Sequence, residues 1–73
     1  MSESALEATA QLYDEAAKEL DLAARHCEVA AGHFRGGEVP RGTAHAWAAL
    51  GHIRGAEQRL DEQAREHSRR SSV

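Results

Sequence analysis

The segment RGGEVPRG, residues 35–42, is the only stretch of this chain that is typical of a turn. It holds the only proline, Pro40, together with Gly36, Gly37 and Gly42. The sequence on both sides is rich in alanine, and aromatic residues make up only 4% of the chain. This composition favours helix over strand. We therefore predict an all-α fold in which the chain turns back once to form an antiparallel hairpin of two helices.

The start of the first helix is indicated by Ser4 and Glu7, which have the spacing of a capping box. In that motif each side chain satisfies one of the unpaired amides of the first helical turn. No proline or glycine follows until Gly32. The first helix is expected at about residues 4–35 and the turn at about 36–39.

The second helix is expected at about residues 40–67. Pro40 suits a helix start because the N–H that proline lacks would have no helical partner there. The last residues, SRRSSV at 68–73, are expected to be a disordered tail. The whole chain, residues 1–73, is expected to be a single domain, because its length supports one small core at most.

Seven-residue spacing predicts which faces of the two helices meet. The first helix has a row of mostly large residues next to a row of alanines: Leu6, Tyr13, Leu20, Cys27 and Phe34, beside Ala10, Ala17, Ala24 and Ala31. The second helix has two similar rows: Ala46, Ile53 and Leu60, beside Leu50 and Ala64. We predict that these rows form the contact within the hairpin, with Tyr13 near Leu60 and Leu20 near Ile53. Cys27 and Trp47 are expected to pack as hydrophobic residues.

A second apolar face remains when these rows are paired. It contains small residues and three larger ones: Thr9, Ala16, Ala23, Ala30, Leu12, Leu22 and Val29 on the first helix, with Ala49 and Ala56 on the second. An isolated hairpin would leave this face in water. We therefore predict that two copies pair through it into a homodimeric four-helix bundle.

Four of the five histidines lie on this second face: His26 and His33 on the first helix, and His45 and His52 on the second. They are bordered by Glu19, Arg59 and Glu66 on the same rows. Imidazole is a common ligand of zinc, copper, nickel and iron. Two histidines seven residues apart on one helix are separated by about 10.5 Å of rise, so a shared ion needs histidines from different helices. His26 and His45 are closest in height.

These four histidines are the predicted metal ligands, with haem as a less favoured cofactor. For Cys27, a role as an extra soft ligand is the less favoured alternative to packing as a hydrophobic residue. The alternative is a structural or adaptor homodimer whose histidines line a pH-sensitive interface and which binds a partner protein. An enzyme is not expected, because the chain has no HExxH, no CxxC and no Glu-x-x-His pair.

The overall composition narrows the range of partners and locations. The net charge of −3 argues against a nucleic-acid partner. The sequence contains no apolar run long enough to predict a membrane span, and its N-terminal residues lack the pattern of a secretory signal. A cytoplasmic location is therefore expected.

The segments AARHCEVAAGHFRGG and AHAWAALGH resemble small bacterial histidine-rich helical-hairpin proteins of unassigned function. The matching positions are spread over both predicted helices: Ala23, Ala24, His26, Ala30, Ala31, His33, Phe34, Gly37, His45, Ala46, Gly51 and His52. The chain departs from the pattern at Cys27, where a second histidine usually stands, and at Trp47 and Leu50. The resemblance implies a helical hairpin and no particular reaction.

Overall fold

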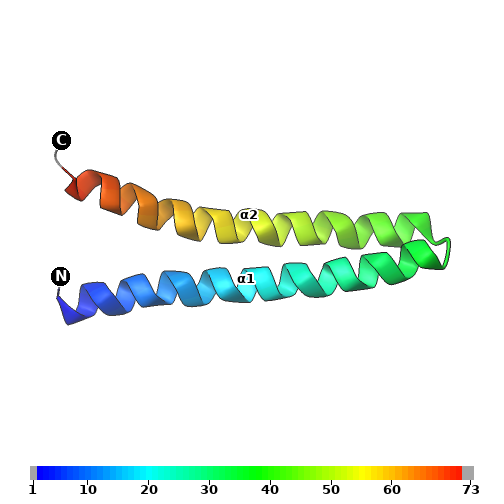
Figure 1. Cartoon of the computed structure of the whole chain (residues 1–73), viewed down its shortest axis with the longest axis horizontal. Helices are drawn as coiled ribbons and strands as arrows, with labels where there is room; N and C mark the ends of the chain where they lie inside the picture. The colour runs from blue at the N-terminus through cyan, green and yellow to red at the C-terminus, as the bar shows by residue number, and fades with distance from the viewer. Residues whose placement is uncertain (1, 72–73) are drawn as a thin grey trace.

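The computed structural model describes residues 2–71 and contains two helices and no strand in that range. Helix α1 spans Glu3–Arg35 and helix α2 spans Val39–Arg70. The helices run antiparallel in an elongated body of 53 × 25 × 12 Å, with both ends of the chain at the end far from the turn (Figure 1). The predicted all-α hairpin is confirmed.

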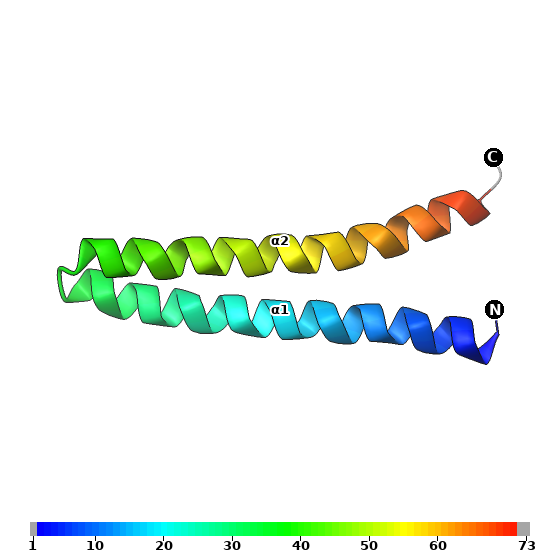
Figure 2. The ribbon, with the colours of Figure 1, turned by 180° about the vertical axis from the view of Figure 1, so that it is seen from behind.

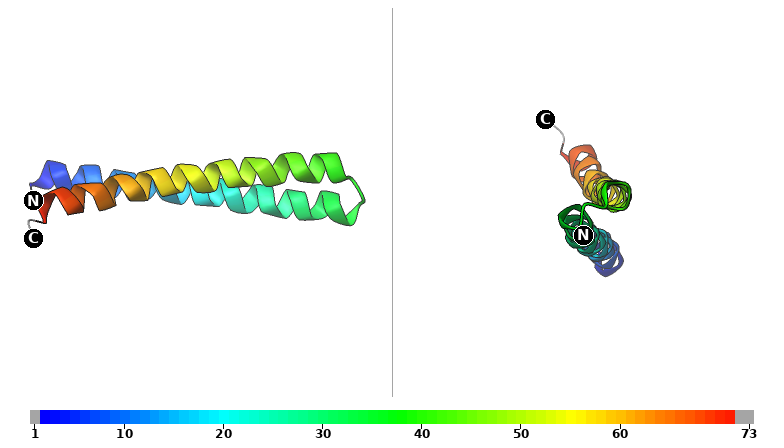
Figure 3. Two further views of the ribbon diagram at one scale, coloured as in Figure 1. Left: turned by 90° about the horizontal axis from the view of Figure 1, so that it is seen from above. Right: turned by 90° about the vertical axis from the view of Figure 1, so that its right-hand side faces the viewer.

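The two helices are not equally close along their length. Figure 2 shows α2 curving away from α1 toward its C-terminal end, and Figure 3 shows the two helices crossing at a shallow angle. The backbones of the two helices are therefore closer together near the turn than near the ends of the chain.

Helix α1 begins slightly earlier than the capping-box pattern predicted. The N-cap is Ser2, whose hydroxyl accepts a hydrogen bond of 3.2 Å from the backbone N–H of Ala5. The predicted capping box of Ser4 and Glu7 is wrong, because both residues already lie inside the helix. Ser2 and Ser4 are equally good capping residues. Starting at Ser2 adds helical hydrogen bonds.

The turn ends α1 with a Schellman motif. The N–H of Glu38 donates to the carbonyl of His33 at 2.8 Å, and the N–H of Gly37 donates to the carbonyl of Phe34 at 3.0 Å. Gly37 has a φ of +74°, the left-handed conformation that this position of the motif requires. Pro40 lies in the first turn of α2, which starts one residue earlier than predicted.

Helix α2 continues through Arg70, three residues beyond its predicted end. Glu66 forms ion pairs with Arg69 and Arg70, and basic side chains in a last turn interact favourably with the helix dipole. Part of the predicted tail is therefore helical, and residues 72–73 lie outside the described residues. The hydrogen bond and charge of Arg69 lower the pKa of Glu66.

Acid is expected to loosen this last helical turn. A carboxylate with a lowered pKa in the folded state contributes stability above its ordinary pKa, and that contribution is lost as the pH falls through the lowered value. The amide signals of Ser68, Arg69 and Arg70 should therefore shift toward coil values on acidification below about pH 4, since the ordinary glutamate pKa is about 4.3. In Glu66→Gln, the same signals should already be coil-like at neutral pH and should not respond further.

The buried surface of the hairpin differs from the predicted one. The buried apolar residues are all alanines, each 2–5% exposed: Ala16, Ala23, Ala30, Ala49 and Ala56. The large residues of the predicted contact lie outside, with Leu20 48% exposed and Ile53 42% exposed. Cys27 is also exposed, as is Trp47 at 65%. The predicted contact face is wrong. The alanines of the face predicted to pair two copies are buried within the hairpin, whereas Leu22 and Val29 of that face are 39% and 44% exposed.

The physical reason is the size of the side chains. Alanine rows on both helices let the backbones approach closely, and the polar rows beside them can then reach each other across the contact. Gly42 continues this close approach at the turn, where an added Cβ would lie 2.8 Å from the ring of Phe34. The predicted register survives the change of face, because Tyr13 and Leu60 still line one shallow surface depression.

Candidate metal site

The four predicted metal ligands come together in one row, which we call the histidine ladder (His26, His33, His45 and His52). Its members alternate between the helices in the order His33, His45, His26 and His52. The ladder lies beside the buried alanines and within one hairpin. The prediction that the histidines lie between two subunits is therefore wrong. This placement follows from the contact face, because the histidines neighbour the alanine rows that meet between the two helices.

The centre of the ladder is a direct contact between imidazoles from opposite helices. The Nδ1 atoms of His26 and His45 lie 2.9 Å apart, and the ring centroids are separated by 5.2 Å. At this distance one Nδ1 carries a proton and donates it to the other. The inner pair (His26 and His45) is therefore joined by a single N–H···N hydrogen bond, with the proton on one nitrogen and the accepting lone pair on the other.

Each inner histidine is stacked against an outer one. His52 lies against His26 with a centroid distance of 5.5 Å and an interplanar angle of 14°. His33 lies against His45 with a distance of 5.4 Å and an angle of 19°. All four rings therefore form a continuous row across the two helices.

Carboxylates hold both outer histidines. Glu19 Oε2 lies 2.9 Å from His52 Nδ1, and Glu38 Oε1 lies 3.2 Å from His33 Nδ1. An ionised carboxylate can only accept, so each of these Nδ1 atoms carries a proton and the Nε2 atom of the same neutral ring has a free lone pair. Arg41 also donates to Glu38, at 2.9 Å.

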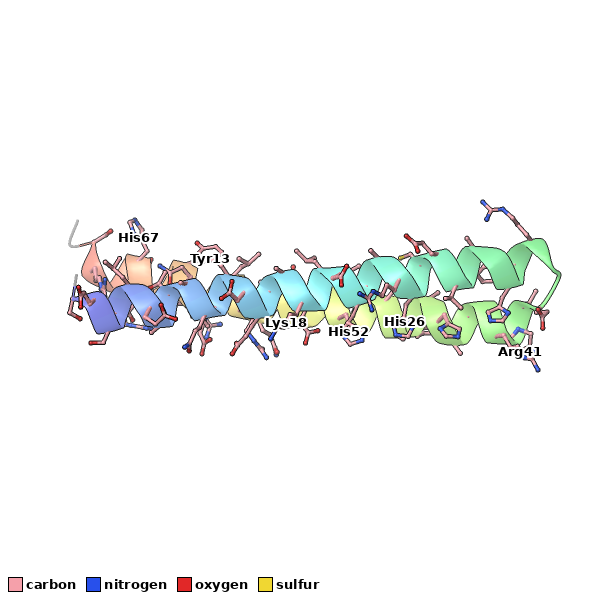
Figure 4. All side chains as sticks on the ribbon, turned by 90° about the horizontal axis from the view of Figure 1, so that it is seen from below. Tyr13, Lys18, His26, Arg41, His52 and His67 are labelled. Atoms are coloured by element: carbon pink, nitrogen blue, oxygen red, sulfur yellow. The ribbon has the colours of Figure 1, made fainter. Side chains whose placement is uncertain are left out.

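The ladder is accessible from one side of the hairpin. Figure 4 shows His26 and His52 along one edge of the molecule, with Tyr13 and His67 along the opposite edge. The side chains of His33 and His52 are 25% and 30% exposed. An ion can therefore reach the ladder without passing through the buried alanines.

Metal ligands need to converge as well as to be neighbours. Within residues 2–71, no three histidine, cysteine, aspartate or glutamate side chains stand in an arrangement that could hold a metal ion. The inner pair does converge, whereas the outer rings lie parallel to their neighbours. Cys27 lies on another face of α1, about 100° around the helix from His26, so its predicted role as an extra ligand has no support in the geometry.

Comparison of the chain with protein-family models, with curated proteins and with solved structures found no match. Its function is therefore inferred from its own residues. In the described part of the chain, neither helix is long and apolar enough to cross a membrane.

Two contributors to the site were not predicted from the sequence. Glu38 falls in the predicted turn at about residues 36–39, and the Schellman motif brings it beside His33. Gly55 has no side chain, and an added Cβ atom would lie 2.7 Å from Glu19 Oε2, so its contribution depends on a residue of the other helix. Glu19, in contrast, is predicted to border the histidines, since it lies seven residues before His26.

Proposed function

We propose that this chain is a non-enzymatic metal-binding protein that takes up a transition metal ion through the histidine ladder. The observation that carries the proposal is the 2.9 Å separation of the Nδ1 atoms of His26 and His45. Two nitrogens that share a tetrahedral zinc ion at about 2.0–2.1 Å lie about 3.3 Å apart. Replacing the shared proton by a metal ion therefore requires an opening of only a few tenths of an ångström.

The chemistry of the ladder favours zinc, copper, nickel or iron, the ions for which neutral imidazole is a preferred ligand. The inner pair supplies two ligands. For a third ligand, the ring of His52 or His33 would have to turn so that its Nε2 atom reaches the same ion, and water would complete the coordination. A haem is a poorer fit, because its flat ring would have to enter between two imidazoles that are in hydrogen-bonding contact.

Titration of the untagged protein with zinc(II), copper(II), nickel(II) and cobalt(II), followed by native mass spectrometry, tests the proposal. We expect at least one of these ions to bind in a fixed ratio to the chain and to raise the melting temperature, since an ion that binds only the folded state stabilises it. A chain that takes up none of the four ions would contradict the proposal.

We further propose that a second copy of this chain covers the exposed apolar surface, which we call the outer face (Leu6, Tyr13, Leu20, Phe34, Ile53 and Leu60). Among the described residues, the isolated hairpin buries only small side chains, which is little for an independently stable fold. A homodimeric four-helix bundle would bury the outer face and leave the histidine ladder at the edge.

Charge complementarity supports a second copy as the occupant. Helix α1 has seven carboxylates and three lysine or arginine side chains, a net charge of −4 with histidine neutral. Helix α2 has four carboxylates and six arginines, a net charge of +2. A dimer that places α1 beside the partner's α2 therefore brings opposite charges together along the rims of the contact.

Leu20→Glu is expected to weaken the dimer by more than about tenfold, because the contact would bury an unpaired charge in each subunit. Leu22→Glu is the matched control, since Leu22 is also exposed but lies on the other side of α1. Analytical ultracentrifugation should give a dimer for the unaltered chain and for the control, and monomers for Leu20→Glu.

A helical monomer of the unaltered chain at micromolar concentration would refute the dimer and leave the outer face available to a different protein. That result would also contradict the adaptor alternative, which is a homodimer. The histidines contact one another within a single hairpin. This arrangement favours the metal-binding proposal over a pH-sensitive subunit interface lined by histidines.

A further inference from the structure

Gly55 lies inside α2 at the place where the side chain of Glu19 crosses over from α1. A Cβ atom added to Gly55 would lie 2.7 Å from Glu19 Oε2 and 2.9 Å from Glu19 Cδ. Gly51, one turn earlier in α2, has nothing within 4 Å of such an atom. A glycine in a helix interior is unfavourable relative to alanine. At position 55 the missing side chain makes room for the carboxylate of Glu19.

The carboxylate that occupies this space is the one that contacts the ladder. Glu19 Oε2 lies 2.9 Å from His52 Nδ1, and the side chain of Glu19 is 26% exposed. Histidines that bind metals usually donate their other ring N–H to a carboxylate or carbonyl, which selects the tautomer and orients the ring. Glu19 stands in this relation to His52, whose ring is stacked on His26 of the inner pair.

We propose that Glu19, held in the space left by Gly55, keeps His52 in the tautomer whose Nε2 atom is free to be the third ligand of the metal ion at His26 and His45. Glu19 is a positioning residue in this arrangement and does not itself contact the ion. The inference rests on the proposed metal-binding function and specifies how the third ligand is prepared.

The same contact makes His52 different from the inner pair. The protein groups facing His52 are the carboxylate of Glu19 and the ring of His26. The inner rings contact other imidazoles and are joined to each other by one hydrogen bond. The tautomer of His52 is therefore set before an ion arrives.

The test compares Gly55→Ala with Gly51→Ala, the same change one turn apart. Both should raise the helix propensity of α2. Gly51→Ala should leave the tautomer of His52 and the zinc affinity unchanged. Gly55→Ala should displace the end of Glu19, so that the imidazole ¹⁵N shifts of His52 in the metal-free chain no longer indicate Nδ1–H alone. Zinc affinity should then fall by about 10–100-fold, the usual effect of losing such a partner.

A third variant separates this effect from a general disturbance of the helix. Glu19→Ala should lower zinc affinity as much as Gly55→Ala does. Adding Gly55→Ala to Glu19→Ala should cause no further loss, because both changes remove one and the same contact. Additive losses would show that Gly55 acts through something other than Glu19 and would overturn the inference.

Different results would contradict the metal-binding function and the positioning of His52 by Glu19. If the unaltered chain binds zinc and Gly55→Ala binds it as tightly as Gly51→Ala, the inference is wrong and the metal-binding function stands. If the His52 tautomer responds to Gly55→Ala but the unaltered chain takes up none of zinc(II), copper(II), nickel(II) and cobalt(II), the ligand role of His52 is overturned together with the proposed function.

Discussion

Replacing both His26 and His45 by alanine is expected to weaken zinc binding by more than about 100-fold. Each substitution removes one of the two nitrogens that face each other at 2.9 Å across the hairpin. Loss of a partner that only orients a ligand already costs about 10–100-fold in affinity, and loss of the ligands themselves should cost more. The affinity is best measured by competition with a chromophoric chelator.

The hairpin itself should survive this double substitution. Alanine is smaller than histidine and is the residue that already forms the buried contact. The hydrogen bond that is lost contributes about 0.5–1.5 kcal/mol. Circular dichroism should therefore still show a helical protein, so that loss of zinc binding can be assigned to the ligands.

His67→Ala is the control variant, because it removes a histidine that lies outside the histidine ladder. His67 lies on the opposite edge of the molecule from His26 and His52 (Figure 4). Its removal should leave zinc affinity unchanged. If the double variant still binds zinc like the unaltered chain, or if His67→Ala is the variant that loses binding, the metal site is not the histidine ladder.

The second large effect is expected at the buried alanines. Ala49→Leu should destabilise the hairpin by about 1–3 kcal/mol, because three extra carbon atoms have no space where Ala49 is only 3% exposed. In a chain of this size each kcal/mol lowers the melting temperature by roughly 4–8 °C. Thermal unfolding should be followed at one fixed protein concentration, because dimerisation makes the midpoint concentration-dependent.

Ala44→Leu is the matched control in the same helix. Ala44 is exposed, and a leucine there meets water and has a good helix propensity. Its melting temperature should stay within a few degrees of that of the unaltered chain. If Ala49→Leu melted no lower than Ala44→Leu, the alanine rows would not form the contact, and the face predicted from the large residues would have to be the buried one.

The helices and the turn were largely readable from the sequence because their signals are local. The glycines and proline of residues 35–42 interrupt an otherwise continuous helical pattern, and the turn forms there. The differences are confined to helix ends. Ser2 replaces Ser4 as the cap, and Glu66 with its two arginines extends α2 to Arg70.

Part of the candidate metal site can also be predicted from the sequence. The row of histidines follows from the seven-residue spacing, and the common height of His26 and His45 follows from folding the chain at the turn. The structure places these two in direct contact. Glu38 and Gly55 could not be recognised in this way, because their roles depend on side chains that reach them from the other helix or across the turn.

The sequence alone determined where the chain is helical, where it turns and which residues lie at equal heights. Only the tertiary structure decided which face of each helix is inside. Both candidate faces repeat every seven residues, and a rotation of each helix by about 100° about its own axis exchanges them. Side-chain size decides between them, because paired alanines allow the close approach at which the polar rows can bond across the hairpin. That approach is a property of two helices together, and the pattern of either helix alone does not contain it.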